Sequence, residues 1–164
     1  MALVLELVRD KLMSVQQRWA DVVFLALAVW REARGEHMSG KIGVASCMLN
    51  RVARPSWWGT DISSVLFKKW QISSLTDPKD RQLTEWPRTN DPAWIECLEV
   101  ALQAVDGTLP DIVPGADSYF DESIPNPPWA TPERFVAKFG RLLFYNVDQD
   151  TETSNKKGEE LCLN

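Results

Sequence analysis

The stretch that decides the fold is VVFLALAVWREARGE, residues 22–36 of a 164-residue chain. Nine apolar residues open it, and a run dense in charged residues follows. An apolar run of this length is too short to span a bilayer and favours a helix buried in a protein core. Asp21 precedes the run and can cap that helix, which we expect to reach about Ala33. This places Glu32 at the C-terminal end of a buried helix.

The sequence on either side of this stretch also favours helices, because apolar residues recur there at helical spacing. Asp61 can cap a short helix, and Asp91-Pro92 combines a capping residue with proline at the first helical position. A length of 164 residues fits one domain, which we expect to be mainly α-helical, with long loops and at most a small β element. The expected helices span 3–17, 21–33, 39–54, 62–69, 92–105 and 132–139, an extended segment spans 142–145, and long loops span 70–90 and 108–130.

Composition excludes several classes of partner. The formal net charge is −5, whereas nucleic-acid-binding domains carry basic faces that neutralise phosphates. The three cysteines, Cys47, Cys97 and Cys162, are an odd number at wide spacing, which favours free thiols in a reducing cytoplasm. Residues 1–15 mix charged and apolar residues, as amphipathic helices do and signal peptides do not. We therefore expect no nucleic-acid partner, no signal peptide and no stable membrane association.

The chain contains a single histidine, His37, and this narrows the possible chemistry. A Ser-His-Asp or Cys-His hydrolase needs a histidine beside its nucleophile, and zinc enzymes normally use two or three histidine ligands. The sequence also contains no glycine-rich phosphate loop and no dinucleotide fingerprint. We therefore expect neither a metal nor a cofactor, we place His37 on the surface, and carboxylate chemistry remains.

Glu32 is the carboxyl group that best fits such chemistry. Cleavage of a glycosidic bond needs one carboxylic acid with a raised pKa, which protonates the leaving oxygen. Burial beside the apolar run and the negative end of the helix dipole both disfavour the charged form of Glu32. The alternative is that Glu32 is a surface charge paired with Arg31 or Arg34.

Two blocks of sequence, EARGE at 32–36 and GKIGVASCMLNRV at 40–52, closely resemble the SleB-type cell-wall hydrolase family. This family includes the peptidoglycan-cleaving domains of spore-germination enzymes and of some phage endolysins. Weaker matches follow in the family's order, and together the resemblance covers roughly residues 22–146, leaving a polar tail at 148–164. These matches are WQIS at 70–73, GADSYF at 115–120 with PW at 128–129, and FGRLLFY at 139–145.

The resemblance implies a lysozyme-like fold for a single catalytic domain over residues 1–164. It also implies that Glu32 is the catalytic acid of a muramidase or lytic transglycosylase. Such enzymes cut the β-1,4 bond between N-acetylmuramic acid and N-acetylglucosamine in peptidoglycan glycan strands. The family usually has a histidine near Leu142 or Leu143, and commonly an aromatic residue where this chain has Ile72. The roles of those two positions therefore do not carry over to this chain.

A true hydrolase needs a second carboxylate, and three acidic residues are candidates. Glu36 follows Glu32 by four residues, although it can equally cap the next helix or pair with Arg34. Asp121 and Glu122 belong to the loop that we expect to face Glu32, although solvation of that loop explains them equally well. The sequence leaves hydrolysis and transglycosylation as open alternatives.

Four residues in the family-like loops are candidates for binding the glycan. Gln71 and Ser73 can hydrogen-bond acetamido or hydroxyl groups, or else stabilise a turn. Tyr119 and Trp129 can stack on the faces of sugar rings, or else pack against their neighbours.

The biological setting that we expect is a phage endolysin, because no signal peptide and no separate wall-binding module are recognised. Such an enzyme would wait as a monomer in the host cytoplasm until lysis and then act on the cell wall. One alternative is a wall hydrolase of the bacterium itself, serving spore germination or wall remodelling. Others are a non-catalytic peptidoglycan-binding module of the same fold and an amidase that cuts the peptide.

Overall fold

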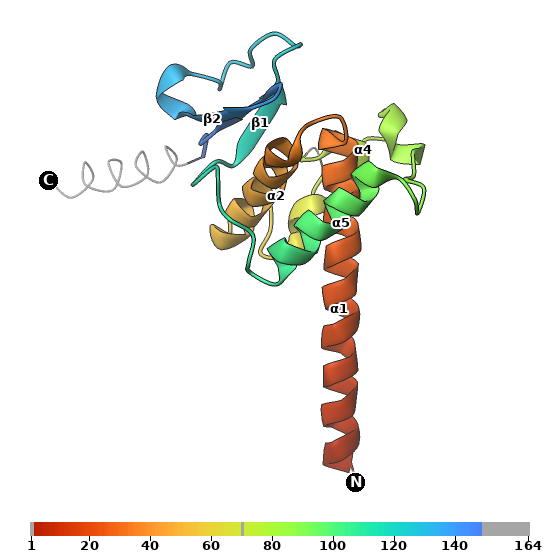
Figure 1. Ribbon diagram of the computed structural model, residues 1–164. Coiled ribbons are helices and arrows are strands. Elements are labelled where there is room, and N and C mark those ends of the chain that lie inside the picture. Colours follow the sequence, from red (N-terminus) through yellow and green to blue (C-terminus); the bar gives the residue numbers. More distant parts are fainter. Residues whose placement is uncertain (1, 70, 149–164) are drawn as a thin grey trace, which may run out of the picture.

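The computed structural model describes residues 2–69 and 71–148, with side chains from residue 11 onward. Three long helices, α1 (Ala2–Ala33), α2 (Met38–Ala53) and α5 (Pro92–Val105), build the core, and a small sheet packs beside α2 (Figure 1). Trp70, Cys162 and the polar tail from residue 149 lie outside the described residues. The remaining elements are α3 (Ile62–Leu66), α4 (Ser73–Thr76), η1 (Arg81–Thr84), β1 (Ser118–Asp121), η2 (Pro132–Arg134), β2 (Phe135–Phe139) and β3 (Leu142–Tyr145).

Helix α1 is one continuous helix of 32 residues, so the expected division at Asp21 is wrong. Neither glycine nor proline occurs within α1, and nothing in its sequence therefore ends a helix near residue 20. The Asp21 carboxylate caps nothing there, and instead accepts hydrogen bonds from Gln17 Nε2 at 2.9 Å and Ser63 Oγ at 3.0 Å. The N-terminal half of α1 projects from the domain as a rod (Figure 1).

The continuity of α1 also overturns the argument that its apolar run is too short to cross a bilayer. By length and composition alone, Lys11–Ala33 is long enough and apolar enough to do so. A signal sequence and the core helix of a soluble protein pass the same test. In this fold the last third of α1 packs in the core, where Leu25 and Val29 are completely buried.

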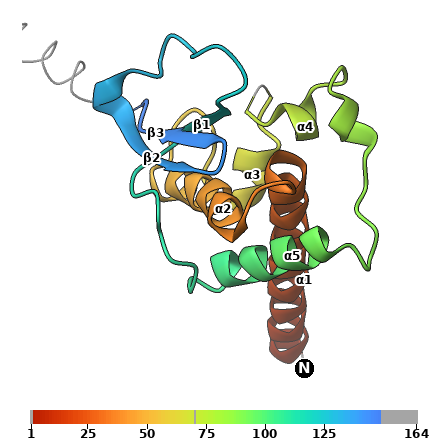
Figure 2. The same cartoon turned by 45° about the horizontal axis from the view of Figure 1, so that its top comes forward.

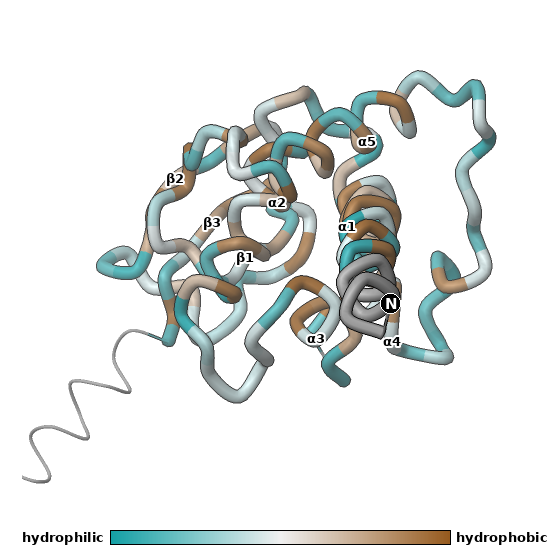
Figure 3. The backbone as a smooth tube through the Cα atoms, turned by 90° about the horizontal axis from the view of Figure 1, so that it is seen from below, coloured by the Kyte–Doolittle hydropathy of each residue, from teal (hydrophilic) through white to brown (hydrophobic). Residues whose placement is uncertain are grey.

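The core forms where α1, α2 and α5 meet. Figure 3 views α1 along its axis, with α2, α3 and α5 grouped beside it. Leu25 and Met48 fill this core, and alanines such as Ala26 and Ala45 let the helix backbones approach closely. The cysteines Cys47 and Cys97 are free and buried, as expected, and burial raises the pKa of each thiol to about 12.

The sheet has the strand order β1-β3-β2 and is antiparallel throughout. Its β3 is the expected extended segment, but β1 lies inside the stretch 108–130 that we expected to be irregular. The predicted helix over 132–139 is wrong, because Thr131-Pro132 opens only the short 3-10 helix η2. The next residues, FVAKF, favour a strand and pair with β3 through a turn at Gly140, which has a φ of 58°.

Close packing fixes the sheet against α2. A Cβ atom at Gly43 would lie 2.6 Å from the ring of Phe144, so only glycine lets this β3 residue rest on the helix. Phe144 is completely buried there. The strand β1, paired with β3, is thereby held beside the C-terminal end of α1.

Two capping predictions are confirmed. Asp61 forms a capping box with Ser64 at the start of α3, although that helix ends at Leu66 rather than at residue 69. Asp91 accepts a hydrogen bond from the backbone N–H of Ala93 and begins α5. The stretch 70–90 is more ordered than expected, because it contains α4 and η1.

Candidate active site

Glu32 lies in the last turn of α1, where two other segments reach its carboxyl group. Ser74 of α4 donates its hydroxyl to Glu32 Oε1 at 2.5 Å, and Tyr119 of β1 donates its phenol to Oε2 at 3.1 Å. Three elements that are distant in sequence therefore converge on one carboxyl group. Part of the Glu32 side chain remains accessible to solvent.

The environment of Glu32 favours its protonated form. Burial raises the pKa of Glu32, and the negative charge of Asp80 raises it further. The hydrogen bonds from Ser74 and Tyr119 and the charge of Arg51 act in the opposite direction, but the net shift of the pKa is upward. Burial, followed by the charge of Glu32, also raises the pKa of Tyr119 well above its ordinary value, so Tyr119 remains a proton donor.

The two arginines beside Glu32 are bound to other groups, so the interpretation of Glu32 as a surface ion pair is wrong. Arg34 pairs with Glu85 at 2.6 Å. Arg31 is buried, and its guanidinium donates to the carbonyl oxygens of Ser74 at 2.7 Å, Leu83 at 2.9 Å and Glu85 at 2.9 Å. Arg31 thereby fastens the segment containing Ser74 to the end of α1.

A pocket of about 300 Å³ opens beside Tyr119, within the usual size range of a ligand site. Gln71, Tyr119 and Trp129, three of the four residues predicted to bind glycan, line it. Trp57 and Arg51 line it as well. Flat aromatic rings and hydrogen-bonding groups thus meet in a pocket that is linked to Glu32 through Tyr119.

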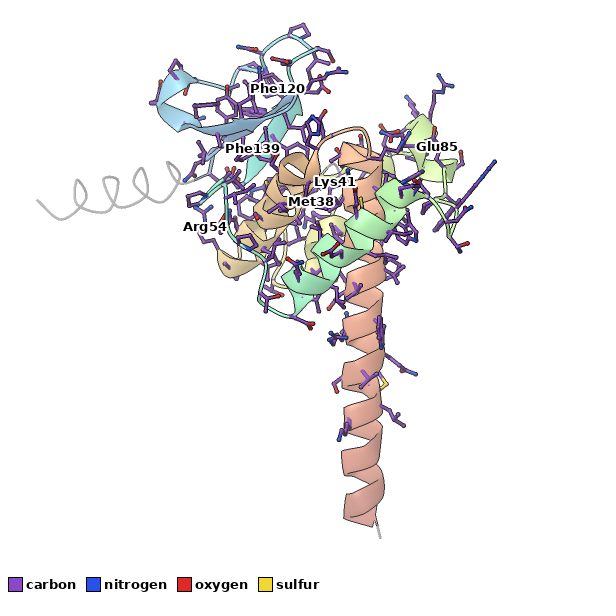
Figure 4. The ribbon with its side chains drawn as sticks, viewed as in Figure 1. Met38, Lys41, Arg54, Glu85, Phe120 and Phe139 are labelled. Carbon is purple, nitrogen blue, oxygen red and sulfur yellow. The ribbon has the colours of Figure 1, made fainter. Side chains whose placement is uncertain are left out.

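Trp129 packs against its neighbours and also lines the pocket, so sugar stacking stays a prediction. Its ring meets Phe120 and Tyr145 edge to face, at centroid distances of 5.8 and 5.7 Å. Figure 4 labels Phe120 on the sheet. These contacts hold the indole of Trp129 in one orientation in the pocket wall.

The fourth predicted residue, Ser73, is not among the residues that line this pocket. Its hydroxyl donates to Asp80 Oδ2 at 2.7 Å, while that of its neighbour Ser74 reaches Glu32. Sequence reasoning missed Ser74 and Asp80. The adjacent serines at 73 and 74 were visible, but nothing in a stretch assigned as irregular indicated which one faces Glu32.

The three predicted second carboxylates gather around the β2–β3 hairpin. Asp121 pairs with Arg141 at 2.9 Å, and Glu36 Oε2 accepts a hydrogen bond from the backbone N–H of Arg141 at 3.2 Å. Glu122 pairs with Lys138. Burial would raise the pKa of Asp121, but hydrogen bonds from Ser123 and Arg141 lower it overall. Such an environment favours a carboxylate held in an ion pair.

His37 is exposed, as expected, at the N-terminus of α2, and its side chain makes no capping hydrogen bond. Within residues 2–69 and 71–148, no group of three or more His, Cys, Asp or Glu residues is placed to hold a metal ion. The described site consists of the Glu32 carboxyl group, the hydroxyls of Ser74 and Tyr119, and the aromatic pocket that Tyr119 lines.

Residues 35–145 match the family model described as Cell Wall Hydrolase. The chain is also 27% identical over 124 residues to the spore cortex-lytic enzyme of Bacillus subtilis (strain 168), and 30% identical over 124 residues to that of Bacillus cereus. Each alignment covers 76% of this chain, but only 37% and 43% of the two relatives. The chain therefore spans less than half the length of these relatives.

Two solved structures resemble the fold. The catalytic domain of the Bacillus cereus SleB protein matches with a TM-score of 0.59 and 26% identity, over 76% of this chain and 88% of that one. The catalytic domain of the germination-specific lytic transglycosylase SleB from Bacillus anthracis gives the same score and identity, over 76% and 93%. They confirm the resemblance and the mainly helical class.

The family match begins just after Glu32, so it does not include the residue that the sequence resemblance predicts as the catalytic acid. The matched span still includes both residues that contact its carboxyl group, Ser74 and Tyr119. The match covers well over half of the sequence. The chain belongs to the cell wall hydrolase family.

Proposed function

We propose that this domain cleaves the β-1,4 bond between N-acetylmuramic acid and N-acetylglucosamine in peptidoglycan, with Glu32 as the general acid. One observation carries the proposal: the Glu32 carboxyl group has a raised pKa, lies at a helix end and is bonded to two hydroxyls, one of which belongs to Tyr119 in the wall of an aromatic pocket. The names of the relatives, spore cortex-lytic enzymes, support the choice of substrate.

Glu32 supplies the proton that the leaving group needs. As the bond between the anomeric carbon and the bridging oxygen breaks, the Glu32 proton moves to that oxygen, and positive charge develops on the sugar ring. Glu32 is then a carboxylate, which the hydroxyls of Ser74 and Tyr119 stabilise by hydrogen bonds. The carboxylate next accepts a proton from the attacking hydroxyl, which restores the acid.

The surroundings of Glu32 favour transglycosylation over hydrolysis. A hydrolase uses a second carboxylate to activate water or to attack the sugar. The predicted second carboxylates instead bind groups of the β2–β3 hairpin: Asp121 pairs with Arg141, and Glu122 with Lys138. A transglycosylase needs only Glu32, because the 6-hydroxyl of the muramic acid displaces the bond, giving an anhydro product without consuming water.

The test is mass spectrometry of the fragments released from purified peptidoglycan. Wild type is expected to release anhydro-muramic fragments, each one water lighter than a hydrolytic product. Glu32→Gln is expected to lower the rate by on the order of 10³-fold, the usual contribution of a general acid. Glu99→Gln on the exposed face of α5 is the matched control and should retain full activity.

Other products identify other functions. Fragments of hydrolytic mass refute the transglycosylase mechanism but keep the glycosidase. New free amino groups without new sugar ends indicate an amidase. Binding to peptidoglycan without any release, by wild type and Glu32→Gln alike, indicates a non-catalytic module.

We infer that the domain belongs to a wall-lytic protein of a bacterium, rather than to a phage endolysin. The relatives are spore enzymes of Bacillus and of related genera. Fractionation of the expressing cell tests this inference: recovery from the wall or spore coat fraction supports it, and recovery only from the cytoplasm contradicts it.

A further inference from the structure

Trp86 is the most exposed large apolar side chain among the residues whose side chains are described, with 71% of its surface accessible. Single exposed apolar residues are common on proteins and need a second feature before they indicate a site. Trp86 has one, because the guanidinium of Arg31 lies 5.3 Å from the centroid of its indole ring. The cation covers one face of the ring and leaves most of the indole open to solvent.

The support beneath this ring is fixed in place. Arg31 is buried and bonded to three backbone carbonyls, those of Ser74, Leu83 and Glu85. Glu85, which precedes Trp86 and is labelled in Figure 4, is held in turn by Arg34. A ring held in this way loses little conformational freedom when a ligand stacks on it, which favours binding.

Trp86 follows a segment that bonds one oxygen of Glu32, and the pocket is lined by a residue that bonds the other. Trp86 follows α4 and η1, the segment that contributes Ser74 to one oxygen of Glu32. The pocket lies beside Tyr119, which is bonded to the other oxygen. Figure 2 shows α4 and the sheet on opposite sides of the end of α1. The segment that leads to Trp86 and the strand that lines the pocket therefore meet at one carboxyl group.

We propose that Trp86, supported by Arg31, is a second sugar-stacking site that binds the glycan strand on the side of Glu32 opposite the pocket. The ligand is a β-linked pyranose polymer, whose flat C–H faces stack on indole rings. This proposal rests on the proposed function, since it assigns a longer stretch of the same substrate. The proposal accounts for an exposed indole ring that a buried, hydrogen-bonded arginine supports.

The test is calorimetric binding of peptidoglycan glycan fragments of graded length, from four sugars upward, to the Glu32→Gln protein. The Glu32→Gln background removes cleavage, so binding is measured apart from activity. Affinity is expected to rise with length until a fragment reaches Trp86. Adding Trp86→Ala should remove that last rise, about fivefold in affinity, while leaving the shortest fragment unaffected. Trp86→Phe should keep most of the rise.

Trp19→Ala is the matched control. Trp19 is also exposed, and the guanidinium of Arg18 lies 5.4 Å from the centroid of its ring. It lies in α1 thirteen residues before Glu32. Trp19→Ala should bind like the parent at every length. Identical curves for Trp86→Ala and the parent overturn the proposal. Equal weakening at all lengths also overturns it, because that result indicates a disturbed loop. A parent protein that binds no fragment refutes the proposed function itself, and the stacking site with it.

Discussion

The two halves of α1 share one continuous backbone but lie in different surroundings. In the C-terminal half, Leu25 and Val29 are completely buried, and Glu32 meets α4 and β1. In the N-terminal half, Leu12 and Met13 are 59% and 60% exposed. The helix itself follows from local sequence, since no breaker interrupts it. The site follows from tertiary contacts, which the C-terminal half makes through Glu32.

Truncating a leucine in each half should give the largest difference. Leu25→Ala leaves a cavity in the core and is expected to lower the free energy of unfolding by about 2–5 kcal/mol. Leu12→Ala removes only exposed surface and should change that free energy by less than about 0.5 kcal/mol. Urea unfolding measures both. Similar losses in the two variants would mean that the projecting half is packed against a partner in solution.

Substituting one arginine at the site, Arg31, and one near the middle of α1, Arg18, sharpens the comparison. Arg31→Ala leaves buried carbonyls without a donor and is expected to cost about 3 kcal/mol of stability, with a marked loss of kcat as Ser74 loses its anchor. Arg18→Ala breaks the exposed ion pair with Asp106 and the contact with the Trp19 ring, and should cost less than about 1 kcal/mol. Thermal melts and peptidoglycan-release rates measure the two effects. Full activity in a folded Arg31→Ala protein contradicts the anchoring role.

Substitutions beside Glu32 should move the pH profile in opposite directions. Activity needs protonated Glu32, so the rate falls as pH rises through its pKa. The Ser74 hydrogen bond lowers that pKa, so Ser74→Ala is expected to shift the alkaline limb to higher pH, with about a tenfold loss of kcat. The charge of Asp80 raises it, so Asp80→Asn is expected to shift the same limb to lower pH. Shifts in the same direction for both variants would refute this electrostatic account.

Local sequence signals predicted the parts of the fold that local chemistry decides. The caps at Asp61 and Asp91, the buried end of α1 and the strand β3 were all recognisable. The predictions that were wrong concern segments whose structure depends on tertiary contacts. Asp21 resembles a cap but faces Ser63, and the residues after Thr131-Pro132 become a strand because β3 pairs with them.

The sequence was enough to propose Glu32, but it could not show which residues contact the Glu32 carboxyl group. Glu32 was identified by an apolar run and a family-like block of sequence. Ser74 and Asp80 escaped because they lie in a stretch whose path is set by the buried guanidinium of Arg31. Trp86 escaped for the same reason, since nothing in its neighbouring sequence shows that Arg31 lies beneath its ring.

The measurement that tests the central claim most directly is an NMR titration of the Glu32 carboxyl carbon, assigned by its loss in Glu32→Gln. The account predicts a midpoint clearly above the value of about 4.3 for a free glutamate, since burial and Asp80 raise the pKa of Glu32. Such a midpoint leaves Glu32 protonated and able to donate a proton at mildly acidic pH. A midpoint at or below the free value would contradict the assignment of Glu32 as the general acid.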